Sequence, residues 1–259
     1  MDTISSKITF LKTYLPELRN QILSRTIHTV EIKNGYFDDI VTDMDLFIQN
    51  QLIEQLRNHF PDTRFLAEEN HQQDCSDYLW IIDPIDGTKN FFRRHEDYAI
   101  SIAYYEFGKP LFGMVYDVAK DQLFYGIKDE GAWMNDQVLP ALSVKSLNQS
   151  VLDMNLKTLY ALEKRQANIE GLSKQVFAHR SIGSAAISLC RMALGSHDIY
   201  LNSHLKLWDF AAARIILEEV GGVVSFPFDE DPQLDDQSVF LFACTSLIQE
   251  DALKKALFE

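Results

Sequence analysis

The sequence predicts an α+β protein, because helical and strand-like hydrophobic patterns occupy different parts of the chain. Apolar residues within 4–22 recur every three or four positions, which is the spacing of an amphipathic helix. Between residues 98 and 127, three apolar runs separated by turn residues indicate an antiparallel meander. Segments 185–194 and 210–220 are again helical in pattern and are followed by glycine. Helices and strands in separate blocks are typical of the α+β class.

The chain is long enough for one substantial core. Its 259 residues, 46% of them apolar, predict a single unit with two halves, about 1–145 and about 146–259. The longest apolar stretch, residues 239–248, has the length of a strand, so we expect no membrane partner and a cytoplasmic location. Cys75, Cys190 and Cys244 match neither a disulfide framework nor a zinc site and are expected to be reduced thiols.

The most informative segment is D-P-I-D-G-T-K-N-F at residues 83–91, directly after the apolar run 78–82. A buried strand that ends in Asp83 and Asp86 is unusual, because carboxylates near a core are costly unless a partner or a metal compensates them. Gly87 permits a tight bend, and Thr88 is expected to cap a following helix whose N–H groups face an anion. Taken alone, the motif also fits an ordinary turn with two solvated aspartates.

Further acidic residues lie at the ends of other predicted elements. Glu68 and Glu69 follow a strand candidate at 63–67, Asp45 precedes a helical pattern, and Asp209 is predicted to be a helix N-cap. If Glu68, Asp83, Asp86 and Asp209 met in space, about four negative charges would require cations between them. Hard oxygen ligands favour Mg²⁺, Mn²⁺ or Ca²⁺.

The charge balance restricts the partners. The chain carries 38 acidic and 24 basic residues, a formal net charge of −14, so we expect no nucleic-acid polymer as a partner. Divalent ions would reverse the local charge and allow a small phosphorylated substrate to bind. The seven histidines show no H-x-x-x-H or H-E-x-x-H spacing, which argues against a zinc hydrolase.

Several segments together resemble the signatures of the inositol monophosphatase family of Mg²⁺-dependent, lithium-sensitive phosphatases. The matching segments are 41–45, the pair Glu68–Glu69, 83–91, 131–135, 180–186 and 208–216. Their order and spacing cover most of the chain, which makes the resemblance specific. It implies a layered αβαβα sandwich of the inositol monophosphatase and fructose-1,6-bisphosphatase type, a homodimer, a metal-binding N-terminal half and a substrate-side C-terminal half.

The resemblance also implies individual roles. Glu68, Asp83 and the carbonyl of Ile85 would hold a first Mg²⁺, and Asp83, Asp86 and Asp209 a second. A third, weaker ion would lie near Glu68, and Mn²⁺ could substitute. Thr88 and Asp45 would act on the attacking water. The expected phosphate and substrate contacts are Gly87, Thr88, Ser184, Ala185 and Asn202.

The substrate stays open at this point. Inositol-specific members carry a glutamate where this chain has Asn202, while Lys89 gives a D-G-T-K sequence like that of members acting on 3′-phosphoadenosine phosphate or histidinol phosphate. The first hypothesis is hydrolysis of inositol 1-phosphate or a related sugar or polyol phosphate. The alternatives are the same chemistry on 3′-phosphoadenosine 5′-phosphate, NADP or histidinol phosphate, and a catalytically idle metal-binding protein. Four residues have undecided roles: Glu69, Lys89, Arg180 and Lys206.

Overall fold

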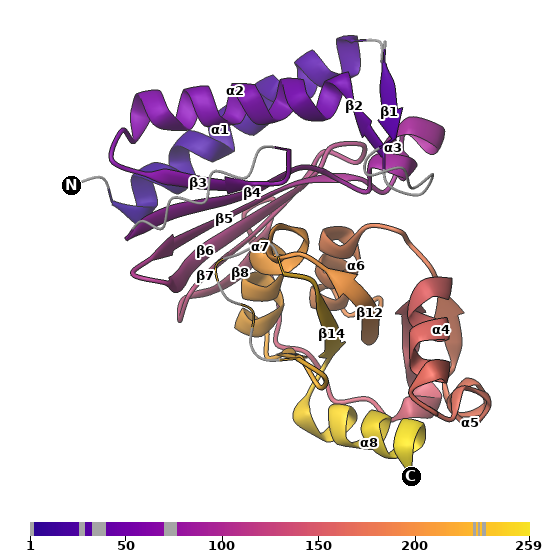
Figure 1. The fold of residues 1–259 in the computed structure, drawn as a ribbon. Coiled ribbons are helices and arrows are strands. Elements are labelled where there is room, and N and C mark those ends of the chain that lie inside the picture. The colour runs from indigo at the N-terminus through magenta and orange to yellow at the C-terminus, as the bar shows by residue number, and fades with distance from the viewer. Residues whose placement is uncertain are drawn as a thin grey trace.

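Helical and sheet layers alternate through the molecule (Figure 1). The computed structural model describes residues 3–25, 29–32, 40–69, 77–229, 232, 234 and 237–259. A helix pair covers a seven-stranded sheet, a second helix pair separates that sheet from a five-stranded one, and further helices cover the outer side. The predicted α+β class and the αβαβα order are therefore confirmed. Cys190 and Cys244 are free and buried, whereas Cys75 lies outside the described residues.

The first layer consists of α1 (Ile4–Ser24) and α2 (Asp43–His59). The predicted N-terminal helix is confirmed and continues through Pro16. Its apolar stripe packs with α2 against the sheet, around a core that includes Leu15, Ile48 and Trp80. A two-stranded ladder of β1 (Val30–Ile32) and β2 (Ile40–Thr42) precedes α2.

The seven-stranded sheet holds its strands in chain order. They are β3 (Arg64–Ala67), β4 (Tyr78–Asp86), β5 (Ala99–Glu106), β6 (Lys109–Asp117), β7 (Gln122–Ile127), β8 (Gly131–Met134) and β9 (Gln137–Val138). Only β3 and β4 pair in parallel; the remaining pairs are antiparallel, as the predicted meander requires. The parallel register places Glu68, directly after β3, beside the end of β4, where its N–H donates to Ile82 O at 3.2 Å.

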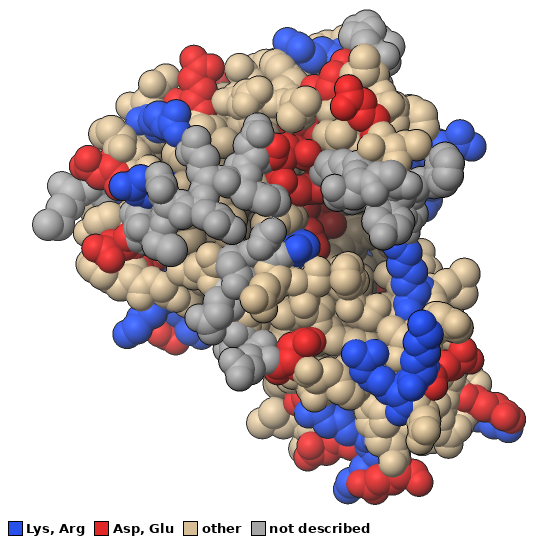
Figure 2. Space-filling model, viewed as in Figure 1, with Lys and Arg blue, Asp and Glu red and all other residues tan. Residues whose placement is uncertain are grey.

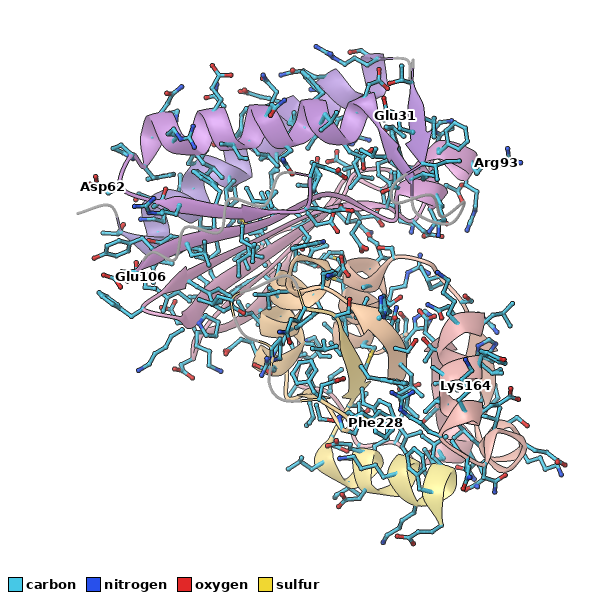
Figure 3. The ribbon with its side chains drawn as sticks, viewed as in Figure 1. Glu31, Asp62, Arg93, Glu106, Lys164 and Phe228 are labelled. Atoms are coloured by element: carbon cyan, nitrogen blue, oxygen red, sulfur yellow. The ribbon has the colours of Figure 1, made fainter. Side chains whose placement is uncertain are left out.

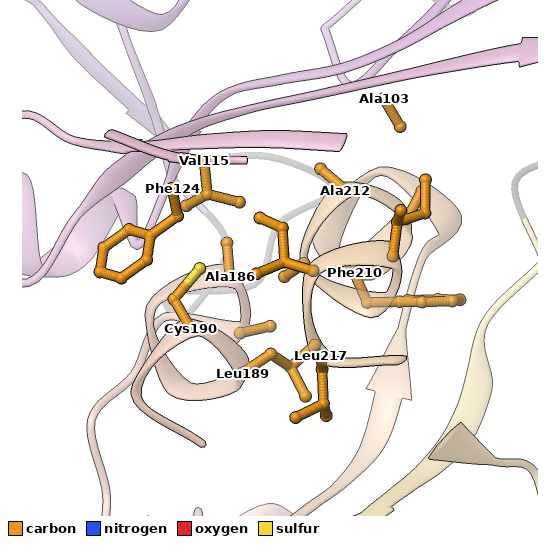
Figure 4. Close-up of a cluster of buried hydrophobic side chains, with 14 of the residues drawn as sticks. Ala103, Val115, Phe124, Ala186, Leu189, Cys190, Phe210, Ala212 and Leu217 are labelled. Carbon is orange, nitrogen blue, oxygen red and sulfur yellow. The ribbon is translucent and has the colours of Figure 1, made fainter. Parts of the chain in front are cut away.

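The middle layer consists of α6 (Ala185–Ala193) and α7 (Leu207–Glu219), whose buried faces meet the sheet in an apolar cluster (Figure 4). Two glycines let α7 approach closely. Gly113 and Gly126 are register partners on β6 and β7, and a Cβ at Gly113 would lie 2.2 Å from Ala212 O. A Cβ at Gly126 would lie 2.9 Å from Ile216 Cα, one helical turn further on. This contact fixes the height of α7, and therefore of its first turn, above the sheet.

Gly113→Ala is expected to destabilise the fold by roughly 3 kcal/mol, because backbone rather than a flexible side chain occupies the added methyl's place. Chemical denaturation measures the change. Gly108→Ala is the matched control, since its Cβ meets nothing within 4 Å and only the positive φ of 74° opposes it, at about 1 kcal/mol. Equal losses in the two variants would contradict the close contact of α7.

The five-stranded sheet and its covering helices complete the fold. The strand order is β11 (Ala178–Arg180), β10 (Val151–Met154), β12 (Ile199–Leu205), β14 (Val239–Cys244) and β13 (Val223–Ser225). The outer helices are α4 (Leu156–Lys164), α5 (Ile169–Gln175) and α8 (Leu247–Phe258), with the short 3₁₀ helix η2 (Leu147–Gln149) nearby. Phe228, labelled in Figure 3, joins α8 to this sheet through ring contacts with Phe240, Phe242 and Phe258.

The helical periodicity at residues 156–177 belongs to two helices, α4 and α5, and Gly171 lies inside α5. The break falls at 165–168 because Asn168 caps the second helix and accepts from Gly171 N at 2.8 Å. The division into halves near residue 145 stays a proposal. Among the described residues, no helix combines the length and the apolar character needed to span a membrane.

Candidate functional site

The end of β4 presents the two aspartates of the sequence motif. The strand continues past the apolar run 78–82 through Asp86, and its register with β5 is irregular between Asp83 and Asp86. Asp83 is buried and its Oδ1 accepts from Ile85 N at 3.0 Å. Gly87 then takes φ 91°, and a Cβ there would lie 3.0 Å from Asp97 O. The bend is therefore tight and specific for glycine.

Thr88 faces Asp45 instead of capping a helix. The N-cap of α3 (Thr88–Arg94) is Gly87, so the predicted capping role of Thr88 is wrong. Its Oγ1 lies 3.2 Å from Asp45 Oδ1 and 3.1 Å from Ile85 O. Asp45 is fully buried inside the first turn of α2, and its Oδ2 accepts from Thr42 N at 2.9 Å and from the Thr42 hydroxyl. The capping box of α2 thus leaves the other carboxylate oxygen for Thr88.

Asp86 is held by the N-terminus of α6. Its Oδ2 accepts from Ala186 N at 2.7 Å and from the Ser184 hydroxyl, and its Oδ1 accepts from Ala185 N at 3.2 Å. Ser184 is also the N-cap of this helix and accepts from Ile187 N at 3.2 Å. Ser184 and Ala185, which were predicted as substrate contacts, therefore position a carboxylate of the site in this structure.

Asp209 reaches the same place from α7. It is the third residue of that helix and not its N-cap, because Lys206 takes the cap position and donates its N–H to Asp209 Oδ2 at 2.7 Å. The start of α7 lies against the end of β4. Ser101 pairs with Asp83 across the sheet, and its Oγ lies 3.4 Å from Trp208 O.

These carboxylates lie close enough together for each negative charge to raise the pKa of its neighbours. Burial raises the pKa of Asp83, and the charges of Glu68, Asp86, Asp209 and Asp45 raise it further. Burial also raises the pKa of Asp86 to about 6, against the opposing effect of its hydrogen bonds with α6, while the charge of Glu68 adds to the rise. The pKa of Asp209 is raised by burial and by Asp86 and Glu68.

The donor set fits hard divalent cations. It consists of carboxylate oxygens and a backbone carbonyl. The carboxylates raise one another's pKa values by charge repulsion, and a bound cation would offset that repulsion. The geometry is not that of a closed metal cage: in the described part of the chain, no three His, Cys, Asp or Glu side chains form a ready-made metal site. Asp83 and Asp209 each accept a backbone N–H at one oxygen, and Asp86 accepts at both, but an ionised carboxylate has about four lone-pair sites, so sites for a cation remain on each group.

Thermal stability is expected to couple pH and Mg²⁺. A carboxyl whose folded-state pKa is raised contributes stability below its unfolded pKa of about 4 and loses it as pH rises through the folded value, about 6 for Asp86. These groups should therefore destabilise the metal-free protein more at pH 7.5 than at pH 5. At a fixed concentration that is a hundred times its Kd at pH 7.5, Mg²⁺ should raise Tm by roughly 5 °C or more at that pH, and by less at pH 5, where protonated carboxyls bind it more weakly. Scanning calorimetry that found equal Mg²⁺ shifts at both pH values would contradict the carboxylate cluster.

Three of the carboxylates, those of Glu68, Asp86 and Asp209, border a cavity of about 600 Å³. Figure 2 shows acidic side chains gathered in the hollow of this face, with a basic side chain at its edge. The predicted site residues among its lining are Glu68, Asp86, Gly87, Thr88, Lys89, Ser184, Ala185, Asn202 and Asp209. Asp45, Asp83 and Ile85 are buried and are not among the lining residues.

Asn202 uses both ends of its side-chain amide internally. Its Nδ2 donates to the Tyr200 hydroxyl at 2.9 Å, and its Oδ1 accepts from His204 N at 3.0 Å. It lies where the register of β12 with β14 shifts, so these two bonds stabilise an irregular strand end. Asn202 therefore lines the cavity as part of its wall.

The four residues of undecided role have different surroundings. Lys89 is exposed and lines the cavity, whereas Arg180 is outside the lining and donates from Nη1 to His179 O at 2.8 Å. The Nζ of Lys206 lies 6.0 Å from the centroid of the Trp208 ring. Glu69 donates its N–H to Gln49 Oε1 at 2.9 Å and is not among the lining residues.

Asn90 and Asp153 are among the polar residues of the cavity wall that were not singled out from the sequence. Asn90 Nδ2 donates to Asp97 O at 2.9 Å and to Ile182 O at 2.8 Å, which joins the β4 bend to the turn before α6. Asn90 belongs to the D-G-T-K-N-F motif and could have been noticed there. Asp153, within the apolar strand V-L-D-M, carries the same signal of an acid in a buried strand that singled out Asp83.

Both the sequence and the fold of this chain match known proteins of one family. Residues 8–257 match the model of the Inositol monophosphatase family. Inositol-1-monophosphatase of Bacillus subtilis is 36% identical over 200 residues, which are 75% of this chain and 74% of that protein. A Nus factor SuhB of Xylella fastidiosa is 31% identical over 218 residues, 82% of this chain and 77% of that protein. The chain belongs to the inositol monophosphatase family.

A solved structure agrees with this assignment over nearly the whole chain. An IMPase/NADP phosphatase complexed with Mg²⁺ and phosphate superposes with a TM-score of 0.85 at 27% identity, covering 98% of this chain and 95% of that one. The fold is therefore that of the family, and the predicted resemblance is confirmed.

Proposed function

We propose that the protein is a Mg²⁺-dependent phosphomonoesterase that hydrolyses inositol 1-phosphate or a related polyol phosphate to the alcohol and inorganic phosphate. The observation that carries the proposal is the meeting of Glu68, Asp83, Asp86 and Asp209 beside the Thr88–Asp45 pair. These groups come from α2, from the residue after β3, and from β4, α3 and α7, and their convergence destabilises the metal-free protein at neutral pH. The arrangement lowers the stability of the metal-free fold but provides ligands for a cation, so we infer that its role is cation binding.

The ligand roles proposed here are those that the family resemblance implies. Glu68, Asp83 and the Ile85 carbonyl would hold one Mg²⁺, and Asp83, Asp86 and Asp209 a second. Bound there, the ions would neutralise phosphate charge and lower the pKa of a water molecule. Mn²⁺ shares the ligand preference and is expected to substitute.

The chain's own residues orient the nucleophile and the phosphate. The Thr88 hydroxyl can donate its proton to Asp45 Oδ1 while its oxygen accepts a hydrogen bond from the attacking water. Asp45 is kept in place by Thr42, so a proton accepted through Thr88 stays next to a fixed carboxylate. The N–H groups of Gly87 and Thr88 at the glycine bend are proposed to donate to phosphate oxygens.

A nucleotide phosphate is the second candidate substrate, and two observations favour it. Asn202 is occupied by Tyr200 and His204, which weakens recognition of polyol hydroxyls, and the lysines Lys89 and Lys157 line the cavity. A solved relative is also an IMPase/NADP phosphatase. Cationic side chains near the site would favour a substrate with a second anionic group.

Turnover of matched substrates tests the choice between the two. We expect Mg²⁺-dependent phosphate release from inositol 1-phosphate, with a higher kcat/KM than for NADP or 3′-phosphoadenosine 5′-phosphate. Lys89→Ala should change kcat/KM for inositol 1-phosphate by less than about threefold and lower it more for the nucleotides. A kcat/KM at least tenfold higher for a nucleotide would replace the first candidate with the second. Mg²⁺ binding without turnover of any ester would favour the idle metal-binding alternative.

A further inference from the structure

Asp153 is a buried carboxylate to which none of the roles above is assigned. It lies on β10, is 2% exposed, and pairs in register with Arg180 of β11 and Tyr200 of β12. It also lines the cavity together with Asp86. A carboxylate in such a position is costly unless hydrogen bonds satisfy both of its oxygens. Its partners therefore indicate what it does.

Both oxygens of Asp153 bind the segment around the start of α6. Oδ1 accepts from Ile182 N at 3.2 Å, and Oδ2 accepts from Ser188 Oγ at 2.6 Å. Ser188 Oγ is also 2.7 Å from Ser184 O, but that carbonyl already accepts Ser188 N–H at 3.1 Å. Since a hydroxyl has one proton to donate, we assign it to the carboxylate.

The segment that Asp153 holds is the one that orients Asp86. Ile182 is fixed on two sides, because its N–H donates to Asp153 and its carbonyl accepts from Asn90 at 2.8 Å. Two residues later, the Ser184 hydroxyl donates to Asp86, and the N–H groups of the next two residues donate to the same carboxylate. Any displacement of the turn at 182–186 would move all three donors to Asp86.

We propose that Asp153 is a positioning residue that fixes the turn at 182–186 and, through it, the orientation of Asp86 for binding Mg²⁺. Asp153 acts through the turn and not as a ligand, because it is almost fully buried and both of its oxygens are engaged. This inference rests on the proposed metal-dependent function.

Three variants separate positioning from charge and from stability. Asp153→Ala removes both hydrogen bonds. Asp153→Asn removes the charge but keeps an oxygen for Ile182 N–H and an amide that can donate to Ser188 Oγ. Asp198→Ala is the matched control: Asp198 is 1% exposed, accepts from Val151 N at 2.8 Å and lies outside the cavity lining.

The readouts are amide hydrogen exchange of the 182–186 segment in metal-free protein, Mg²⁺ affinity by calorimetry, and kcat and KM. For Asp153→Ala we expect exchange about tenfold faster in this segment and Kd for Mg²⁺ about tenfold weaker, the scale for losing a partner of a metal ligand. The value of kcat at saturating Mg²⁺ should stay within about threefold. Asp153→Asn should stay within about threefold in every readout, and Asp198→Ala should change stability alone.

Two results would overturn the proposal. If Asp153→Asn matched Asp153→Ala, the negative charge and not the geometry would matter. If Asp153→Ala matched Asp198→Ala in exchange at 182–186 and in Mg²⁺ affinity, Asp153 would have no positioning role. Absence of Mg²⁺ binding by the unaltered protein would instead reject the proposed function, and the exchange data would still decide whether Asp153 fixes the turn.

Discussion

Asp83→Asn is expected to lower kcat/KM at least about a hundredfold and to raise the half-saturating Mg²⁺ concentration, because Asp83 is proposed to contact both ions. Losing only an outer partner of a metal ligand costs about 10–100-fold, so losing a shared ligand should cost no less. The same change should stabilise the metal-free protein at pH 7.5, since burial and four neighbouring carboxylates oppose the charge of Asp83. Phosphate release against Mg²⁺ concentration, together with thermal melts, measures both effects.

Asp117→Asn provides the control for Asp83→Asn. Asp117 is also a buried aspartate at the end of a strand, β6, but it pairs with Lys120 at 3.3 Å and lies outside the cavity lining. Its substitution should leave the Mg²⁺ dependence unchanged and should not stabilise the metal-free protein. Normal activity of Asp83→Asn at low Mg²⁺ would show that Asp83 does not bridge two ions.

Thr88→Ala is expected to lower kcat by roughly a hundredfold or more while Mg²⁺ affinity stays near normal. The variant removes the hydroxyl that lies 3.2 Å from Asp45 Oδ1, and proton-transfer partners of this kind contribute about 10²–10⁴-fold. Thr88→Ser keeps the hydroxyl and should retain most of the activity. Steady-state kinetics at saturating Mg²⁺ distinguishes the roles, because a change confined to KM would make Thr88 a binding residue.

The sequence contained enough to identify the elements of the site but not their local geometry. Asp83 and Asp86 were predictable because two acids end an apolar strand beside glycine and proline. Asp209 was recognised at the start of a helix but assigned to the wrong position. A carboxylate at the N-cap position and one at the third helical position can both accept unpaired N–H groups of the first turn. Which of the two positions Asp209 occupies depends on how the chain enters the helix at Lys206.

Asp153 illustrates what the sequence pattern alone could not provide. An acid within an apolar strand signals a buried charge, yet its partners Ile182 and Ser188 are 29 and 35 residues away. No local periodicity encodes contacts over that separation, because they depend on how β10 lies beneath the start of α6. Likewise, Asn202 matched a substrate-binding position in sequence, whereas its hydrogen bonds with Tyr200 and His204 emerge only in the folded strand.

The most direct test of the account is inorganic phosphate release from inositol 1-phosphate by the purified protein, with Mg²⁺ and with a chelator. We expect release that requires Mg²⁺ and is lost in Asp83→Asn but retained in Asp117→Asn. Release that continues unchanged in the presence of the chelator, or in Asp83→Asn, would contradict the assignment of the carboxylate cluster as the catalytic metal site.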